Sequence, residues 1–76
     1  MMKKQRYLHI PKPVFIAHRQ TFKKLFNIRK FAIASLYWEH ETPIKEIAKT
    51  YDVSRTRIYQ ILAHIVEKMK KEGYTL

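Results

Sequence analysis

The chain has 76 residues, of which 46% are hydrophobic and 13% aromatic, and its formal net charge is +10. This length allows one domain with a modest core and excludes a second lobe, while the apolar content excludes a wholly disordered chain. The absence of cysteine excludes a disulfide framework and thiolate metal sites. The apolar runs are too short to span a membrane, and no signal peptide begins the chain. We therefore expect a soluble, cytoplasmic protein that contacts no membrane.

Positive charge is concentrated in the first half of the chain. Residues 1–38 contain nine Lys and Arg and no acid, a net charge of +9, because the first acidic residue is Glu39. Residues 39–76 contain seven basic and six acidic residues, a net charge of +1. Such asymmetry indicates a polyanionic partner, a class that includes double-stranded DNA. The alternative is a charged surface that only keeps the protein soluble.

Residues 1–13 are predicted to form a basic extended arm ahead of a helical domain at 14–76. Pro11 and Pro13 disfavour helical geometry in the residues that precede them. The arm residues that we expect to meet DNA phosphates are Lys3, Lys4, Arg6 and Lys12.

Two helices are predicted in the middle of the chain. The first covers 14–26, where Phe15, Phe22, Leu25 and Phe26 fall roughly on one stripe. Asn27 is a good N-cap for the second, which is expected to run to about Glu39.

Two further helices are predicted at 43–72. Thr42 followed by Pro43 indicates a helix start, with the threonine as N-cap and proline in the first helical position. The segment 51–53 interrupts that short helix, Ser54 opens the last one, and Gly73 favours its end near Glu72. The last helix has five apolar residues at helical spacing, which predicts a narrow stripe facing the core: Ile58, Ile61, Leu62, Ile65 and Met69.

The predicted fold class is therefore all-α, a small bundle of about four helices with a C-terminal helix-turn-helix. In that motif the second helix enters the major groove of DNA with its N-terminus first. Thr56, Tyr59 and Gln60 lie opposite the apolar stripe, and Arg55 and Arg57 flank them on the first turn. Arginine reads guanine and glutamine reads adenine most often, so this face suits base recognition.

Phosphate contacts are expected at the starts of the two helices, from Thr42 and from Ser54 with the free amides behind it. The alternative is an amphipathic helix whose polar face only meets water. That alternative explains the periodicity, but it does not explain the paired arginines, the short turn and the preceding helix together.

The stretch from Ile44 to Ile61, IKEIAKTYDVSRTRIYQI, resembles region 4 of the sigma-70 family of bacterial transcription initiation factors. The resemblance extends more weakly over Ile28 to Lys71. It implies a helical domain whose last helix reads the promoter −35 element and which also docks on the flap of RNA polymerase. By position, the base-facing residues would be Arg55, Thr56, Tyr59 and Gln60, while Arg57 and Lys49 would meet phosphates.

This sequence departs from the family pattern at two reading positions. Family members that read the usual −35 sequence tend to have an acid where Thr56 stands and an arginine where Tyr59 stands. We therefore expect a different or weaker sequence preference. The other sigma regions are absent from these 76 residues, so we expect a small regulator rather than a complete initiation factor, of the kind that phages or mobile elements encode.

Nothing in the sequence predicts an enzyme, a cofactor or a metal site. His9, His18, His40 and His64 are too widely spaced for a local zinc motif, and packed or solvated histidines are the better interpretation. The single glycine excludes phosphate-binding glycine loops. Trp38 with Tyr37 is more often part of the core than an exposed docking patch, and the same holds for the phenylalanine cluster: Phe22, Phe26 and Phe31.

The leading hypothesis is a DNA-binding transcription regulator. The second is an interaction protein that binds RNA polymerase or a sigma factor, with DNA contact secondary. RNA binding ranks last, because neither an aromatic sheet platform nor a GxxG loop is present. The sequence leaves the target site, the direction of regulation and the oligomeric state open.

Overall fold

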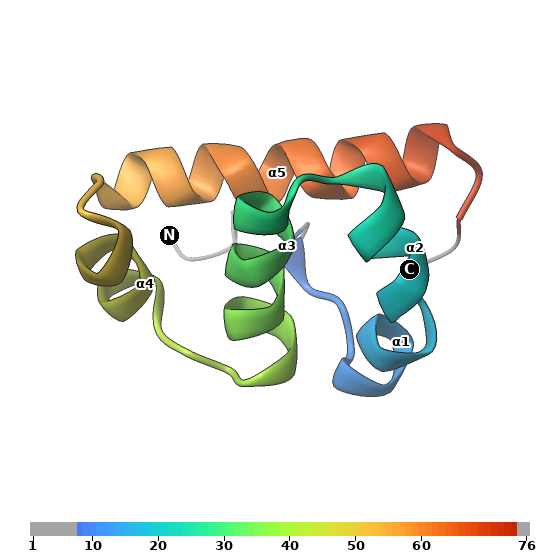
Figure 1. The fold of residues 1–76 in the computed structure, drawn as a ribbon, viewed down its shortest axis with the longest axis horizontal. Coiled ribbons are helices and arrows are strands. Elements are labelled where there is room, and N and C mark those ends of the chain that lie inside the picture. Colours follow the sequence, from blue (N-terminus) through green and yellow to red (C-terminus); the bar gives the residue numbers. More distant parts are fainter. Residues whose placement is uncertain (1–7, 75–76) are drawn as a thin grey trace.

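The computed structural model describes residues 8–74, and within them it contains only helices and connecting turns. The helices are α1 (Lys12–Ala17), α2 (Arg19–Leu25), α3 (Ile28–Ala34), α4 (Ile44–Tyr51) and α5 (Arg55–Lys71), with a π-helical segment η2 (Ser35–Glu39) after α3. Helix α5 runs along one side of the molecule, and α2, α3 and α4 follow one another beneath it (Figure 1). The predicted all-α fold is confirmed.

The helical part of the chain begins earlier than the predicted residue 14. Helix α1 begins at Lys12, so the expectation that Lys12 belongs to an extended segment is wrong. Pro11 is the N-cap, and its carbonyl oxygen accepts hydrogen bonds from the amides of Val14 and Phe15. Pro13 fits in the first turn because amides there have no partner within the helix, so a missing N–H costs nothing.

The helix predicted over 14–26 is two helices that meet at His18. The backbone of His18 leaves helical geometry at φ −103° and ψ 13°. Its amide donates to the carbonyl oxygens of both Val14 and Phe15, and its Nδ1 lies 3.2 Å from the Val14 oxygen. This crowding of donors at one carbonyl accompanies the bend. Because the bend divides one predicted helix into two, the number of α-helices within residues 8–74 is five rather than the expected four.

Helix α3 begins as predicted, because the Asn27 side chain accepts a hydrogen bond from the Lys30 amide at 2.8 Å. The helical segment also reaches Glu39, but its last turn is wider than an α-helix. The amide of His40 donates to the carbonyl oxygen of Ser35, five residues back. Such π-turns often lie at functional sites, and this one turns Trp38 into the core.

Helix α4 begins one residue later than predicted. Pro43 is the N-cap rather than the first helical residue, with ψ 142°, and Thr42 makes no capping bond in its place. The prediction that Thr42 caps this helix is therefore wrong: the Pro43 carbonyl accepts from the amides of Glu46 and Ile47, and the Thr42 amide donates to Leu36. At the other end Asp52 takes the left-handed conformation, with φ 55°, and breaks the helix.

Helix α5 matches its prediction closely. The Ser54 hydroxyl oxygen accepts a hydrogen bond from the Arg57 amide at 3.1 Å, which is the expected N-cap. All five predicted core residues are buried, together with Val66. The helix ends at Lys71, and Gly73 follows with φ +90°, a conformation that favours glycine.

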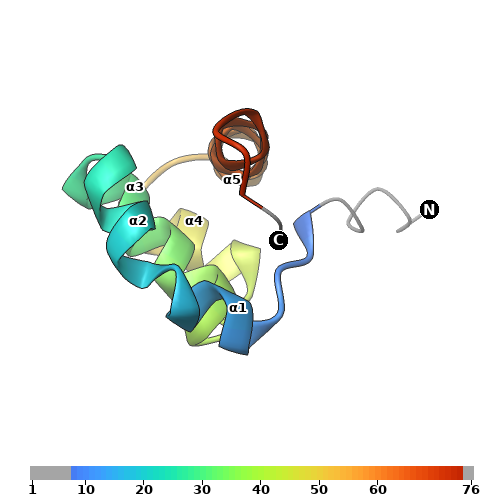
Figure 2. The same cartoon turned by 90° about the vertical axis from the view of Figure 1, so that its right-hand side faces the viewer.

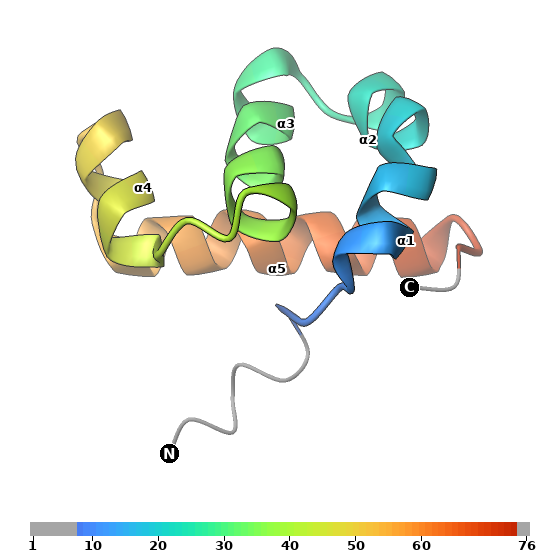
Figure 3. The same cartoon turned by 90° about the horizontal axis from the view of Figure 1, so that it is seen from below.

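Among the core residues that the sequence pattern does not predict are Leu8 and Ile10, both buried ahead of α1. They belong to the segment that leads directly into α1, drawn in blue in Figure 3. The core interpretation of Trp38 is confirmed, since the side chain is buried, and Phe15 and Phe22 pack within about 6 Å of it. Within residues 8–74, no buried side chain is polar or charged.

Candidate nucleic-acid interface

The N-terminal end of α5 presents a polar, solvent-exposed surface. Its exposed side chains are Ser54, Arg55, Thr56, Arg57 and Gln60. On the opposite side of the same turns, Ile58 and Ile61 are buried against the rest of the domain. The buried face fixes the rotation of α5, and four of the predicted DNA-contacting side chains on its first two turns therefore stay accessible.

Tyr59 differs from the other residues predicted to read bases. It is half-buried and packs against the core. Its phenol is near that of Tyr37, whose pKa is raised by burial and by the proximity of Tyr59. This environment supports a role for Tyr59 in holding α5 against the core as much as in contacting DNA.

The turn between α4 and α5 is held by local and aromatic contacts. The Val53 amide donates to the carbonyl oxygen of Ala48 at 3.0 Å, which closes the turn around Asp52. The Arg29 guanidinium at the start of α3 lies 5.5 Å from the ring centre of Tyr51, a cation–π distance. These contacts connect α3, α4 and the base of α5 into one unit, with Lys49 exposed on the last turn of α4.

The remaining predicted phosphate contacts lie elsewhere. Thr42 is half-buried on the connector before α4, at the other end of that helix from Ser54. Lys12 lies in the first turn of α1, and Figure 3 shows α1 and α4 at opposite ends of the bundle. The structure thus separates Lys12 from the exposed end of α5. Lys3, Lys4 and Arg6 lie outside the described residues.

The surface also includes two basic side chains that the sequence does not predict to contact DNA: Lys30 and His64. A groove of about 230 Å³ between α3 and α5 is lined by both, together with Arg57, Gln60 and Ile61. His64 continues the stripe of Arg57 and Gln60 at helical spacing, a signal that the sequence does contain. Lys30 arrives by tertiary packing of α3 on α5, for which the sequence has no local signal.

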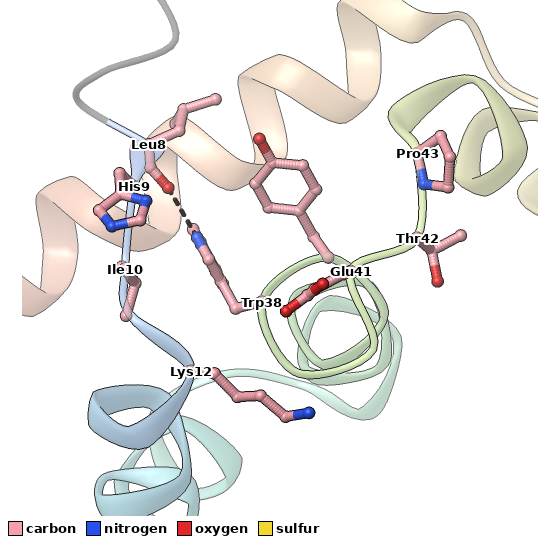
Figure 4. A pocket seen from close by; sticks show the side chains of 9 residues that line it. Leu8, His9, Ile10, Lys12, Trp38, Glu41, Thr42 and Pro43 are labelled. Carbon is pink, nitrogen blue, oxygen red and sulfur yellow. Dashed lines mark hydrogen bonds between the residues drawn. The ribbon is translucent and has the colours of Figure 1, made fainter.

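A second, larger groove lies between the N-terminal segment and the connector before α4 (Figure 4). It has a volume of about 450 Å³, and its walls include Leu8, Ile10 and Trp38, with Lys12 and Glu41 at its edge. Glu41 has φ 54°, a left-handed conformation that is uncommon outside glycine. This groove is more apolar than the surface around α5.

An ionic contact joins α2 to the π-helical segment. The Arg19 guanidinium binds the carboxylate of Glu39, and the Ser35 hydroxyl donates to the same carboxylate at 3.3 Å. The Arg19 hydrogen bond holds the pKa of Glu39 below its ordinary value. Because the pair lies away from α5, we interpret it as structural.

The signature of the sigma-70 region 4 family matches residues 31–71, which is more than half of the chain. The chain belongs to the sigma-70 region 4 family. Region 4 domains are non-catalytic helix-turn-helix domains that bind promoter DNA, and the HTH of this member is α4, the turn at Asp52 and α5. No curated protein and no solved structure matches the chain.

Two further observations bear on the type of site that this region 4 domain can hold. Among residues 8–74, no three His, Asp or Glu side chains gather as metal ligands would. None of the helices in that part of the chain is long and apolar enough to cross a membrane.

Proposed function

We propose that the protein regulates transcription by inserting the first two turns of α5 into the major groove of duplex DNA. The observation that carries the proposal is the exposure of Arg55, Thr56 and Gln60 on those turns while the other face of the helix is buried. Arginine and glutamine are frequent readers of guanine and adenine edges in the major groove.

Base reading is assigned to Arg55, Thr56 and Gln60, with Tyr59 as a partly buried member of the same face. Thr56 and Tyr59 stand where relatives that read the usual −35 sequence tend to have an acid and an arginine. Uncharged side chains at these two positions support a sequence preference that differs from that element.

Phosphate binding is assigned to Ser54, Arg57 and Lys49, which surround the base of α5. The Ser54 hydroxyl already accepts from the Arg57 amide, so it stabilises the first turn whether or not DNA is bound. Thr42 and the arm residues Lys3, Lys4 and Arg6 are proposed as outlying contacts, and Lys12 as the weakest of them because of its distance from α5.

The test is a gel shift with random-sequence duplex DNA, followed by selection of preferred sites from a random library. We expect binding that weakens steeply with added salt, because the chain carries a net charge of +10. We also expect an enriched sequence motif a few base pairs long. Binding to duplex without any enrichment would argue against base reading by α5.

A second function, docking on RNA polymerase or on a sigma factor, is favoured by the groove beside Trp38. Its lining as a whole is more apolar than that of the groove beside α5 and suits a protein side chain better than a nucleic acid. A pull-down on purified RNA polymerase, run beside the gel shift, separates the two functions. Loss of polymerase capture with Lys12→Glu but not with Arg55→Ala would favour docking through this groove.

A further inference from the structure

The groove between α3 and α5 is cationic on both of its walls. Lys30 comes from the first turn of α3, while Arg57 and His64 come from α5. Seen along α5, helix α3 lies to one side of that helix and the N-terminal segment lies to the other (Figure 2). The groove therefore follows the flank of the helix that we propose to enter DNA.

The charges of this groove are not neutralised by neighbours. Within residues 8–74 the ion pairs are Arg19–Glu39 and Lys68–Glu72, so neither Lys30 nor Arg57 is paired with a carboxylate. Beyond His64 the same flank continues with three charged residues of α5: Glu67, Lys68 and Lys71. Glu67 is the one acid that lines the flank near His64, so the local surplus is positive.

Histidine is the side chain that most readily takes up a proton near neutral pH, and His64 is the histidine that lines this groove. It is exposed on α5, one turn beyond Gln60. The other histidines have different surroundings. His18 contacts the Val14 carbonyl and the ring of Tyr74, His9 lines the groove beside Trp38, and His40 follows Glu39 on the connector.

We propose that this groove receives a phosphate of the DNA strand beside α5, and that His64 binds it as an imidazolium ion. Lys30 and Arg57 supply the permanent charge, and His64 adds a contact that depends on pH. A phosphate beside the ring favours the protonated form, so DNA binding takes up a proton. The affinity for DNA therefore rises as pH falls through the range in which imidazole titrates, and is lowest above it. The inference rests on the proposed DNA-binding function.

The experiment measures the affinity of the full chain for one fluorescent duplex by anisotropy, at fixed salt, between about pH 6 and pH 8. Wild-type protein is expected to bind about fivefold more tightly at the lower pH, because DNA binding takes up a proton. His64→Gln should bind as weakly as wild type does at high pH and lose this dependence. His64→Lys should bind tightly at both pH values, because its charge is permanent.

His9→Gln and His40→Gln are the matched controls, since both histidines are exposed and lie outside the groove. Each control should keep the full pH dependence. The inference is overturned if the wild-type affinity does not change with pH, or if His64→Gln keeps the change while a control loses it. If the chain binds no duplex at any pH, the proposed DNA-binding function itself fails, and the two failures are thereby distinguished.

Discussion

The indole Nε1 of Trp38 donates a hydrogen bond to the backbone carbonyl oxygen of Leu8 at 2.6 Å, in the buried interior of the domain. The two residues are 30 positions apart, so the bond fastens the N-terminal segment to the π-helical turn. The side chains of Leu8 and Ile10 in that segment are both buried. This segment is therefore part of the fold, and the basic residues Lys3, Lys4 and Arg6 precede it in the sequence.

Replacing Trp38 tests that attachment. Trp38→Phe keeps an aromatic ring but leaves the Leu8 carbonyl buried without a donor, which costs about 1–3 kcal/mol of the free energy of unfolding. Urea denaturation followed by circular dichroism measures the change. The control is His9→Ala at an exposed neighbour, which should change the stability little. Equal stability of Trp38→Phe and wild type would contradict the anchoring role.

Two truncations separate the charge of the N-terminal segment from its packing. Deleting residues 1–6 removes Lys3, Lys4 and Arg6 but keeps Leu8 and Ile10, so stability should be retained. The slope of log affinity for DNA against log salt should become shallower by about 0.9 for each DNA phosphate that these side chains neutralise in the intact protein. Deleting residues 1–10 should also lower the thermal transition, because two core side chains are removed. A salt slope unchanged by the shorter deletion would show that these residues do not touch DNA.

The buried face of α5 is tested by Ile61→Asp. Ile61 is 7% exposed, and a carboxylate there would be desolvated in the core without a partner. A loss of about 3 kcal/mol or more is expected, enough to abolish the thermal transition of a small domain. The matched control is Gln60→Asp, one residue away and exposed, which should fold. If Ile61→Asp kept its transition, the face assigned to the core would be wrong.

The contact between Arg19 and Glu39 predicts a pH-dependent contribution to stability. The hydrogen bond from Arg19 lowers the pKa of Glu39 from its ordinary value of 4.5. A lowered pKa stabilises the fold above the ordinary value, and that contribution disappears as pH falls through the lowered one. Glu39→Gln should therefore be less stable than wild type at pH about 7, and the difference should vanish in acid. Glu67→Gln, at an exposed glutamate of α5, should show no such convergence.

Base reading and phosphate binding by the HTH have different signatures. Arg55→Ala or Gln60→Ala should cost about 1–3 kcal/mol on the preferred site and relax the preference at one base pair. Lys49→Ala should weaken binding to all sequences about equally, because a phosphate contact carries no sequence information. The comparison is made at one salt concentration. If Arg55→Ala and Gln60→Ala left DNA binding intact but abolished binding to RNA polymerase, α5 would be a protein-docking surface.

The features of the fold that could be predicted from sequence are those with local causes. Asn27 and Ser54 cap their helices through bonds to amides three residues ahead. The apolar stripe of α5 follows from helical periodicity, and Gly73 ends the helix through a conformation open to glycine. Each of these depends on residues a few positions apart.

The features that could not be predicted depend on contacts between distant parts of the chain. The hydrogen bond from Trp38 reaches Leu8, a residue 30 positions away in the sequence. The π-turn at Ser35–Glu39 and the burial of Leu8 accompany this bond. The bend at His18 depends on which carbonyl its amide and ring share. In the candidate site, Arg55 and Gln60 follow from the helix pattern, while Lys30 reaches the same groove only because α3 packs on α5.

The position of α5 in the bundle has a consequence for the synthesis of the protein. Helices α3 and α4 both pack on α5, and Tyr74, just beyond it, lies edge-on against the ring of His18. A ribosome delivers the chain from its N-terminus, so the earlier helices emerge before the helix that covers their apolar faces. Ile33 on α3 and Ile47 on α4 therefore stay uncovered until α5 itself has left the exit tunnel. The bundle can therefore close only after α5 has emerged, and a nascent chain stalled within α5 would be a ready substrate for chaperones and proteases.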